Sequence, residues 1–294
     1  MIENEIKPIL DSEVPDVSIV IVTYKEELEL LKQCFDSVEM SVDIKYEMIV
    51  VDNAGREDTE ALVKQYSYAK YIKNSANLGF AAAVNLGMKR GLARYMLLLN
   101  PDTKFGESVL AQMAEKLDHN PEVGVGSCLI KYPGGEIQDS IRRFPKLLDQ
   151  TLVMLKVPHF LKTKAVDKYM MRDADPLETQ DVDSIMGAFM WIRRELINDI
   201  GYFDERYFIW FEEVDYCKMA HDAGWKIRHY SDTEITHIKG HMFEQIPTLK
   251  KQKWMRESLR KYVKKHVGIP AWLFLWILSP VFIGLGHLVA LIKK

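Results

Sequence analysis

Short apolar strands alternate with helical patterns along the first 130 residues of this chain. The strands that we expect cover residues 17–23, 47–52, 69–72, 95–99 and 123–130; the first is apolar on both faces, and most of the others are nearly continuous apolar segments. Segments with helical spacing separate them, at 28–38, 58–66, 81–90 and 107–117. Strands that alternate with helices predict βαβ units and a mostly parallel sheet. Continuous apolar strands indicate that helices cover both faces of that sheet, as in an α/β protein.

The composition of the chain indicates an ordinary folded protein and argues against several other classes. The 294 residues are 48% apolar and 28% charged, which suits one large domain or one domain with an appendage. The net charge of -3 argues against a general nucleic-acid binder. Cys34, Cys128 and Cys217 have no paired spacing, so we expect neither a disulfide framework nor a zinc site, and a reducing compartment fits. The polar residues 1–16 read as a loose lead-in without a secretory signal.

The middle of the chain is less regular. Pro133, Gly134 and Gly135 mark a turn, and the charged segment Lys162–Thr179 is expected to be a mobile loop. Order returns with one strand over Val182–Ile192 and with a helix over Phe211–Gly224 that Gly224 closes.

The C-terminal tail has two parts. Residues 250–266 contain eight Lys or Arg and one acid, Glu257, and predict a basic amphipathic helix with a charge of +7. Residues 269–292 contain no Lys, Arg, Asp or Glu. Their length allows a membrane span, whereas their prolines and glycines suit a re-entrant hairpin, with Lys293 and Lys294 on the cytoplasmic side, or an in-plane anchor. A buried core helix is the other interpretation. Nearby cations and tryptophans favour an anionic membrane surface as the partner.

Acidic residues follow two of the expected strands. Asp52 ends the strand 47–52, and Asp102 follows the strand 95–99 in the sequence Leu-Asn-Pro-Asp-Thr. The carboxyl ends of parallel strands form the edge at which open α/β sheets bind ligands. There Asp102 could hold a divalent cation against a diphosphate, and Asp52, beside Thr23 and Tyr24, could accept a base N–H or a ribose hydroxyl. All these residue types are also common in turns, which is the alternative explanation.

Two further segments carry polar chemistry. Residues 77–81 form a glycine-containing loop before a helix, where Gly79 permits close backbone approach and a helix N-terminus favours phosphate. Glu212, Glu213 and Asp215 lie near the start of the helix expected at 211–224. The helix dipole also favours acids there, so their position alone does not distinguish a catalytic from a structural role.

These segments together resemble glycosyltransferase family 2, and most closely its bacterial rhamnosyltransferase-like branch. The motifs that carry the resemblance cover residues 17–24, 49–53, 77–81, 99–103, 187–195 and 203–217. The family implies a GT-A fold, a nucleotide-binding α/β fold with a mostly parallel sheet. We therefore expect a nucleotide-sugar half at 17–130, an acceptor half at 131–245, and membrane-associated helices from 246 to 294.

The resemblance also implies roles for individual residues. The donor nucleotide-sugar would contact Thr23, Tyr24, Asp52, Asn77, Gly79, Asn100 and Asp102. Asp102 would bind a divalent cation, Mg²⁺ or Mn²⁺, together with His237, although a lone histidine is more often structural. Glu212 would be the base that deprotonates the acceptor, with Glu213 as the second candidate, while Glu213 or Asp215 would hold acceptor hydroxyls or orient the site. Gly187, Ala188 and Trp210 would line the acceptor side.

Two positions depart from the family pattern. Lys25 stands where asparagine is commoner, and Asn100 replaces the first acid of the Asp-x-Asp metal motif. An amide is a weaker, neutral ligand, so we expect modest metal affinity.

Together with the basic, apolar tail, the resemblance implies an inverting, metal-dependent glycosyltransferase at the cytoplasmic face of the cell membrane. The favoured donor is dTDP-L-rhamnose, and the acceptor is a glycan or a polyprenyl-linked glycan of cell-surface polysaccharide synthesis. A galactofuranosyl- or hexosyltransferase using a UDP-sugar is the alternative within the class. A sugar nucleotidyltransferase is disfavoured because residues 23–27 contain no glycine, and an inactive scaffold subunit because Asp102, Glu212 and His237 are present. A homo-oligomer is compatible with the sequence.

Overall fold

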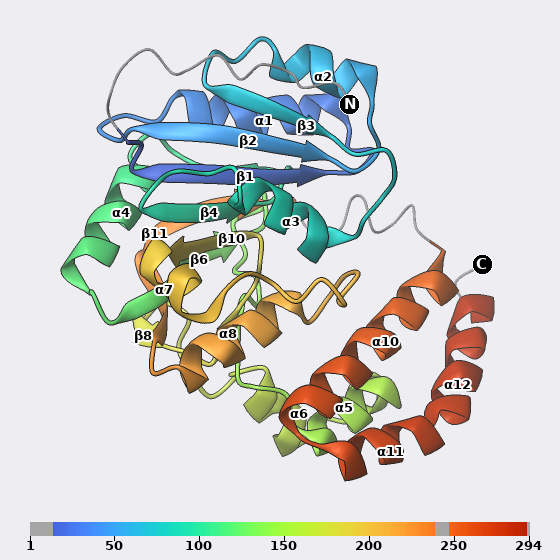
Figure 1. The fold of residues 1–294 in the computed structure, drawn as a ribbon. Coiled ribbons are helices and arrows are strands. Elements are labelled where there is room, and N and C mark those ends of the chain that lie inside the picture. The colour runs from blue at the N-terminus through green and yellow to red at the C-terminus, as the bar shows by residue number, and fades with distance from the viewer. Residues whose placement is uncertain (1–13, 239–246, 293–294) are drawn as a thin grey trace.

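The computed structural model describes residues 14–238 and 247–292 (Figure 1). Three features expected from the sequence fall outside these residues: most of the lead-in, the boundary near residue 245, and Lys293 with Lys294.

A mixed sheet forms the centre of the molecule. Its strand order is β3-β2-β1-β4-β10-β6-β11-β5, with β8 paired to β11. The strands are β1 (Val17–Thr23), β2 (Tyr46–Asp52), β3 (Ala69–Lys73), β4 (Tyr95–Leu99), β5 (Thr103–Lys104), β6 (Val123–Lys131), β8 (Gln180–Asp181), β10 (Phe189–Arg193) and β11 (Lys226–His237). A separate two-stranded sheet joins β7 (Ile141–Arg142) to β9 (Ser184–Ile185).

The N-terminal part of this sheet is parallel, as the sequence predicts. β1 pairs in parallel with β2 and β4, and β2 pairs in parallel with β3. β10 then runs antiparallel to both β4 and β6, which makes the whole sheet mixed. Because β1, β2 and β4 point the same way, Thr23, Asp52 and the turn after Leu99 lie at one edge of the sheet.

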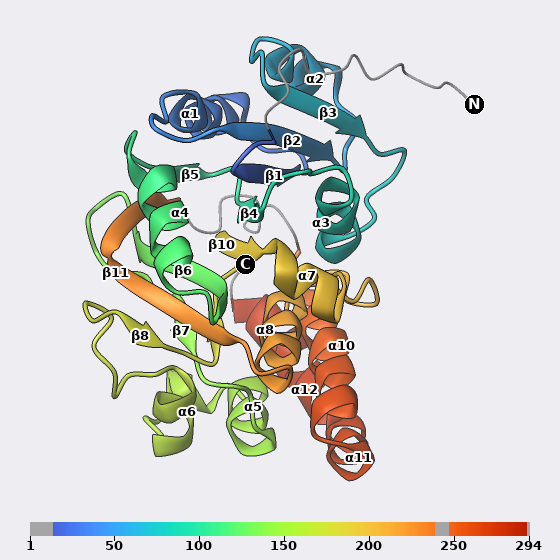
Figure 2. The same cartoon turned by 60° about the vertical axis from the view of Figure 1, so that its left-hand side comes forward.

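Helices cover both faces of the sheet (Figure 2). One face packs against α1 (Leu28–Glu39), α2 (Glu57–Val63) and α4 (Val109–His119), and the other against α3 (Phe80–Met88), α7 (Arg194–Ile200) and α8 (Glu212–Asp222). Alternate residues of β1 divide between the two cores, since Ile19 and Ile21 face the first and Val20 and Val22 the second. The period of two in a strand produces this division.

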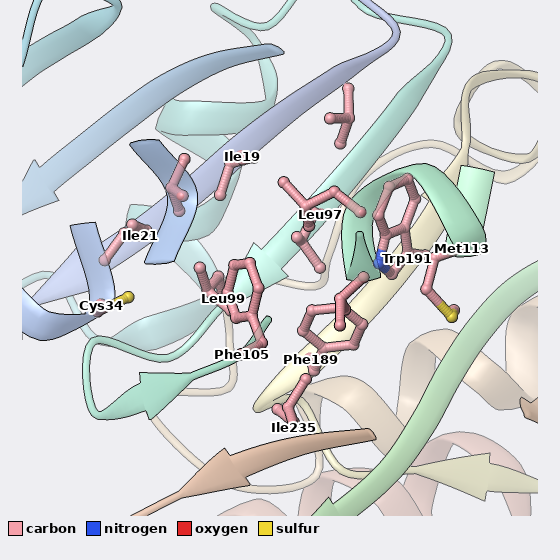
Figure 3. Close-up of a cluster of buried hydrophobic side chains, with 14 of the residues drawn as sticks. Ile19, Ile21, Cys34, Leu97, Leu99, Phe105, Met113, Phe189, Trp191 and Ile235 are labelled. Atoms are coloured by element: carbon pink, nitrogen blue, oxygen red, sulfur yellow. The ribbon is translucent and has the colours of Figure 1, made fainter. Parts of the chain in front are cut away.

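The core on the α4 side is rich in aromatic side chains (Figure 3). Phe189 and Trp191 of β10 lie opposite Leu99 and Leu97 of β4, and the ring of Phe105 is 6.0 Å from that of Phe189. Strand β10, from the expected acceptor half, is thus built into the middle of the nucleotide-side sheet. The division at residue 130 does not separate two cores.

All three cysteines are buried and unbonded to one another. Burial raises the pKa of Cys34 and of Cys217 to about 12, so both thiols stay protonated at neutral pH.

Two segments differ from the sequence prediction. The single strand expected over Val182–Ile192 is divided into β9 and β10, because residues 186–188 form the connection between the two sheets. The segment Lys162–Thr179, expected to be a loop, contains α6 (Lys164–Tyr169), whose first turn is capped by the Thr163 side chain. The residues before this segment form α5 (Leu147–Met154) and the short helix η1 (Val157–His159).

The tail forms α10 (Thr248–His266), α11 (Ile269–Ile277) and α12 (Ser279–Ile292). Leu259, Tyr262 and Val263 of α10 are buried in a third hydrophobic core that also contains Met154 of α5 and Val214 of α8. The basic helix predicted over 250–266 is therefore present, but it shares a core with the domain from which we expected it to be separate.

The apolar segment after α10 is bent. Within the described residues, no single helix is both long and apolar enough to cross a bilayer. Helix α11 and residues 279–287 of α12 are long and apolar enough for a span only when they are taken together, and their axes are inclined by 43° to each other. Pro270 and Pro280 each lie in the first turn of a helix, where a proline is tolerated, so they start helices here.

Candidate active site

Asp102 and His237 face each other at the carboxyl edge of the sheet. Strand β5 begins directly after Asp102 and pairs antiparallel with β11, which sets Thr103 opposite His237. His237 Nε2 therefore lies 3.2 Å from Asp102 Oδ1. The Asp102 side chain is 15% exposed and that of His237 5%. The structure thus brings together the two residues predicted to bind a metal.

Gln138 determines which nitrogen of His237 carries a proton. The Gln138 amide nitrogen donates to the carbonyls of His237 (2.6 Å) and Lys131 (3.3 Å), so its Oε1 is left to accept from His237 Nδ1 at 3.0 Å. In the neutral ring Nε2 is then an acceptor that faces Asp102. Metal-binding histidines are commonly oriented in this way. Nothing in the sequence pattern around Gln138 indicated this role.

The donor set fits one divalent cation held by two side chains. A carboxylate oxygen and an unprotonated ring nitrogen so close together are suitable ligands. Asn100 presents Nδ2 to His237 Nε2 at 3.2 Å, so its amide would have to turn over to offer an oxygen. Around any one point among the described residues there is no group of three or more His, Cys, Asp or Glu for a metal. Diphosphate oxygens and water would therefore supply the other ligands.

Asp52 is fully buried at the end of β2, opposite Thr23. Its carboxylate accepts hydrogen bonds from the N–H groups of Ala54 (2.7 Å) and Arg56 (2.8 Å) and from the Tyr71 hydroxyl (2.8 Å). These bonds shape the loop after β2, so Asp52 has the turn role that we considered as the alternative. A contact with a nucleobase would have to share one of these oxygens.

Glu26 is a buried acid at the same edge that the sequence analysis did not select. Its carboxylate accepts a hydrogen bond from the N–H of Tyr24. The negative charges of Asp102 and Asp52 lie close enough to disfavour its ionised form. Burial is the main cause that raises the pKa of Glu26 to about 7. The two adjacent acids of residues 26–27 look like ordinary surface residues in the sequence, which is why Glu26 was overlooked.

Gly79 makes close backbone contact with the protein, and its predicted contact with the donor stays a prediction. Its φ is +86°, and a Cβ there would lie 2.5 Å from the carbonyl oxygen of Phe208. The side chain of Asn77 accepts a hydrogen bond from the Gly79 N–H at 2.9 Å, and Asn53 donates to the Gly79 carbonyl at 3.1 Å. Gly79 thus joins the donor-side loop to the segment that precedes α8.

Glu212 and Glu213 begin α8, and burial raises the pKa of both carboxyls above the usual value. For Glu212 the charge of Glu213 is the second cause, and for Glu213 the charge of Arg142 opposes the rise. Among the described residues, six buried side-chain polar atoms have no hydrogen-bond partner, and three of them are Thr23 Oγ1, Glu212 Oε2 and Glu213 Oε2. Unpaired buried polar atoms are costly and tend to mark functional sites.

The backbone at residues 187–188 lies between the Asp102–His237 pair and the two glutamates that begin α8. The N–H of Asn100 donates to the carbonyl of Ala188 at 2.9 Å. A Cβ on Gly187 would lie 3.7 Å from Cβ of Glu213, so the backbone at 187–188 bridges the two groups. Ala188 is itself buried in the core. Its backbone carbonyl positions Asn100, and its predicted place on the acceptor side stays a prediction.

Trp210 and Asp215 lie close to Glu212 in the sequence, on either side of it. Trp210 is partly buried and has a left-handed backbone, with φ of 65°. Asp215 is buried, and its carboxylate contacts Lys265 at 2.7 Å, His266 at 2.6 Å and the Tyr207 hydroxyl at 3.2 Å. With these partners Asp215 suits an orienting role better than direct contact with acceptor hydroxyls.

The chain belongs to Glycosyl transferase family 2, whose sequence profile matches residues 18–201. It is a glycosyltransferase. This confirms the family and the class of enzyme that the motifs predicted.

Individual relatives agree with that assignment. The chain is 26% identical over 241 residues to the N-acetylglucosaminyl-diphospho-decaprenol L-rhamnosyltransferase of Mycobacterium tuberculosis, covering 78% of each chain. It is 24% identical over 233 residues to the rhamnosyltransferase WbbL of Escherichia coli, covering 76% of this chain and 84% of that one.

A solved structure has a similar fold. It is the mannosyltransferase PcManGT of Pyrobaculum calidifontis in complex with GDP-Man and Mn²⁺, with a TM-score of 0.57 and 17% identity. The match covers 96% of this chain and 75% of that one. At this identity the likeness supports the α/β fold with its mostly parallel, mixed sheet.

Proposed function

We propose that this enzyme transfers L-rhamnose from dTDP-L-rhamnose to a glycan or polyprenyl-linked acceptor, with inversion at the anomeric carbon, in cell-surface polysaccharide synthesis. The observation that carries the chemistry is the Asp102–His237 pair at 3.2 Å, connected through residues 187–188 to two glutamates that each have a buried, unpaired carboxylate oxygen. The choice of rhamnose is supported by the names of two relatives. A UDP-sugar donor is the alternative.

The residues present suit a single displacement. Glu212 accepts the proton of the acceptor hydroxyl while that oxygen forms a bond to the anomeric carbon, and the bond from this carbon to the diphosphate oxygen breaks. The nucleoside diphosphate leaves with the bonding electrons. A divalent cation bound by Asp102 and His237 would offset the charge that develops on the diphosphate. Arg142, near Glu213, supplies positive charge on the acceptor side.

We also propose that the tail attaches the enzyme to the cytoplasmic face of the membrane. The outer surfaces of α11 and α12 expose large apolar side chains, namely those of Ile269, Leu273, Phe274, Trp276, Ile277, Val281 and Ile283. They adjoin α10, the helix with the +7 charge, which would be attracted to anionic lipid. This combination of apolar and cationic surface is typical of interfacial helices.

The donor is tested with a panel of nucleotide-sugars on the full chain. Thermal unfolding is followed with each dTDP-, UDP- and GDP-sugar, with and without Mn²⁺, because a ligand that binds the native state raises the melting temperature. Donors that stabilise the protein are then incubated with a lipid-linked acceptor, and NMR of the product gives its anomeric configuration. We expect dTDP-L-rhamnose to stabilise most in the presence of Mn²⁺ and to give an inverted product.

Other outcomes would change the proposal. Turnover with a UDP-sugar and none with dTDP-L-rhamnose would establish the alternative donor. A product with retained configuration would exclude the single displacement. For the membrane part, flotation with anionic liposomes at low and high salt is the test, and a chain that stays unbound at both would contradict it.

A further inference from the structure

Helix α10 lies against the segment that leads into the proposed base (Figure 2). Ser258 Oγ donates to the carbonyl of Ile209 at 2.8 Å, and the Lys261 ammonium donates to the carbonyl of Arg206. The ring of Tyr262 is 5.6 Å from that of Phe211. The loop formed by residues 203–211 is therefore held along its length by one face of α10.

The same loop contacts the donor side of the molecule. The N–H of Phe80, the first residue of α3, donates to the carbonyl of Phe208 at 2.7 Å. The ring of Phe208 is 4.8 Å from that of Trp254 on α10. The loop thus lies between the donor-side glycine loop and the tail helix, and either neighbour can affect where α8 begins.

The loop ends in an unfavourable backbone conformation. Trp210 and Phe211 both have left-handed backbones, with φ of 65° and 71°. Large side chains rarely adopt this conformation, and it persists only where the surroundings impose it. Glu212 follows directly as the first residue of α8. The contacts with α10 are therefore suited to hold the turn that directs Glu212.

Helix α10 also supplies the cation and the ring nitrogen that contact Asp215. Asp215 lies three residues after Glu212 and so on the same side of α8. It is 1% exposed, and the groups that face it are Lys265 and His266 of α10 and the hydroxyl of Tyr207. Lys265 also contacts Asp204 at 3.4 Å. The negative charge of Asp215 also raises the pKa of Glu212, although burial and the charge of Glu213 are larger causes.

We propose that α10 is a positioning element of the active site, in which Lys265 and His266 hold Asp215 and thereby fix the orientation and charge environment of the Glu212 carboxylate. This inference rests on the proposed function, in which Glu212 is the base. It gives the tail a part in sugar transfer that is separate from membrane attachment. Lys265 and His266 are positioning residues, since they act through Asp215.

The test compares Lys265→Met, Lys265→Arg and His266→Gln in the full chain, with a soluble acceptor so that membrane binding does not contribute. Lys64→Met is the matched control, because Lys64 also contacts a carboxylate, Glu60, at 2.7 Å, but on the exposed surface of α2. We expect Lys265→Met and His266→Gln each to lower kcat at least tenfold, with the donor KM within twofold of wild type. Lys265→Arg should restore most of kcat, and Lys64→Met should have no effect.

The pH profile distinguishes positioning from a loss of general stability. Without Lys265 the charge of Asp215 is less compensated, which disfavours the ionised form of Glu212. The acid limb of the kcat profile of Lys265→Met should therefore move to higher pH. In Asp215→Asn/Lys265→Met the charge of Asp215 is gone, so the acid limb should lie at or below its wild-type position. If Lys265→Met does not fold, the pH profile of this double variant still tests whether Lys265 acts on Glu212 through Asp215.

Two results would overturn the inference. One is a wild-type kcat and pH profile in both Lys265→Met and His266→Gln. The other is a double variant whose acid limb lies at higher pH than that of wild type. Either result leaves the proposed base intact, provided that Glu212→Gln is inactive in the same assay. Full activity of Glu212→Gln would instead mean that the base assignment itself has failed.

Discussion

His237 meets Asp102 because one strand pairing places them there. Thr103 and His237 are opposite residues of β5 and β11, and the N–H of Ile238 donates to the carbonyl of Asp102 at 2.9 Å. A shift of this pairing by one residue would turn His237 to the other face of the sheet. The geometry of the pair is therefore as well defined as the edge of the sheet itself.

The first prediction concerns metal-dependent nucleotide binding. Asp102→Ala should lower the Mn²⁺-dependent affinity for dTDP or UDP at least tenfold while the protein remains folded, because the anionic ligand is lost. Calorimetric titration with and without Mn²⁺ measures this affinity. Asp232→Ala, at an exposed carboxylate that pairs with Lys116, is the control. An unchanged Mn²⁺-dependent affinity in Asp102→Ala would remove this residue from the metal site.

The second prediction concerns the base. Glu212→Gln should retain donor binding and lose about 10²–10⁴-fold in kcat, the usual effect of losing a general base. Because burial raises the pKa of Glu212 well above its usual value and the base must be ionised, wild-type kcat/KM should rise with pH through a midpoint well above 4.5. Glu213→Gln is the matched variant. If it is inactive while Glu212→Gln works normally, the base is Glu213.

The third prediction concerns the dependence of stability on pH. The pKa of Glu26 is raised to about 7 in the folded chain from 4.5, chiefly by burial, so folding favours its protonated form. Its contribution to stability is complete below about pH 4.5 and is lost as pH rises through 7. Glu26→Gln should therefore gain stability relative to wild type between pH 5 and pH 8, by roughly 3 kcal/mol at most. Urea unfolding of both proteins measures the difference, and a constant difference would show that Glu26 does not titrate in this range.

The fourth prediction concerns Gly79. Gly79→Ala should destabilise the fold by about 2–4 kcal/mol, because a left-handed alanine costs roughly 1–2 kcal/mol and its Cβ would clash with the Phe208 carbonyl. Gly106→Ala is the control, since no atom lies within 4 Å of a Cβ there. Chemical denaturation compares the two variants. Equal stability would mean that the loop at 203–211 moves aside without cost.

The fifth prediction concerns truncation of the tail. A cut after residue 240 removes Leu259, Tyr262 and Val263 from the third core, and each buried side chain of this kind contributes about 1.5–3 kcal/mol. Their sum is comparable to a typical total stability of about 5–15 kcal/mol, so this fragment should unfold or aggregate. A cut after residue 267 keeps all three of these side chains and removes only the part of that core that α11 and α12 supply, so it should leave a folded domain that still binds nucleotide. Circular dichroism and thermal melting of both fragments distinguish the cases.

Much of the fold could be predicted from the sequence because its strands are apolar on both faces. The residues of β1 and β4 coincide with the predicted segments, and α10 begins two residues before its predicted start. The connection at residues 186–188 was missed because Gly187 and Ala188 are compatible with a strand in an apolar segment. Their turn follows from the tertiary position of β10 between β4 and β6.

The candidate site was predictable only where a motif has a fixed place on the sheet. Asp102 and Asp52 follow strand ends, and their location follows from the parallel order. The partners of these residues come from distant segments, as with Gln138 on His237 and Lys265 on Asp215. No local pattern signals such contacts, because they depend on how β11 and α10 pack in three dimensions. For the same reason the sequence predicted α10 to be a membrane-associated helix apart from the domain, and not part of its core.

The burial of Cys34, Cys128 and Cys217 makes this chain convenient for site-specific labelling. Protonated, inaccessible thiols react slowly with maleimides, so a cysteine introduced at an exposed position would be labelled selectively without removing the native ones. Val281 of α12 is 49% exposed and offers such a position. A polarity-sensitive fluorophore there would report directly whether the tail enters an apolar phase when vesicles are added.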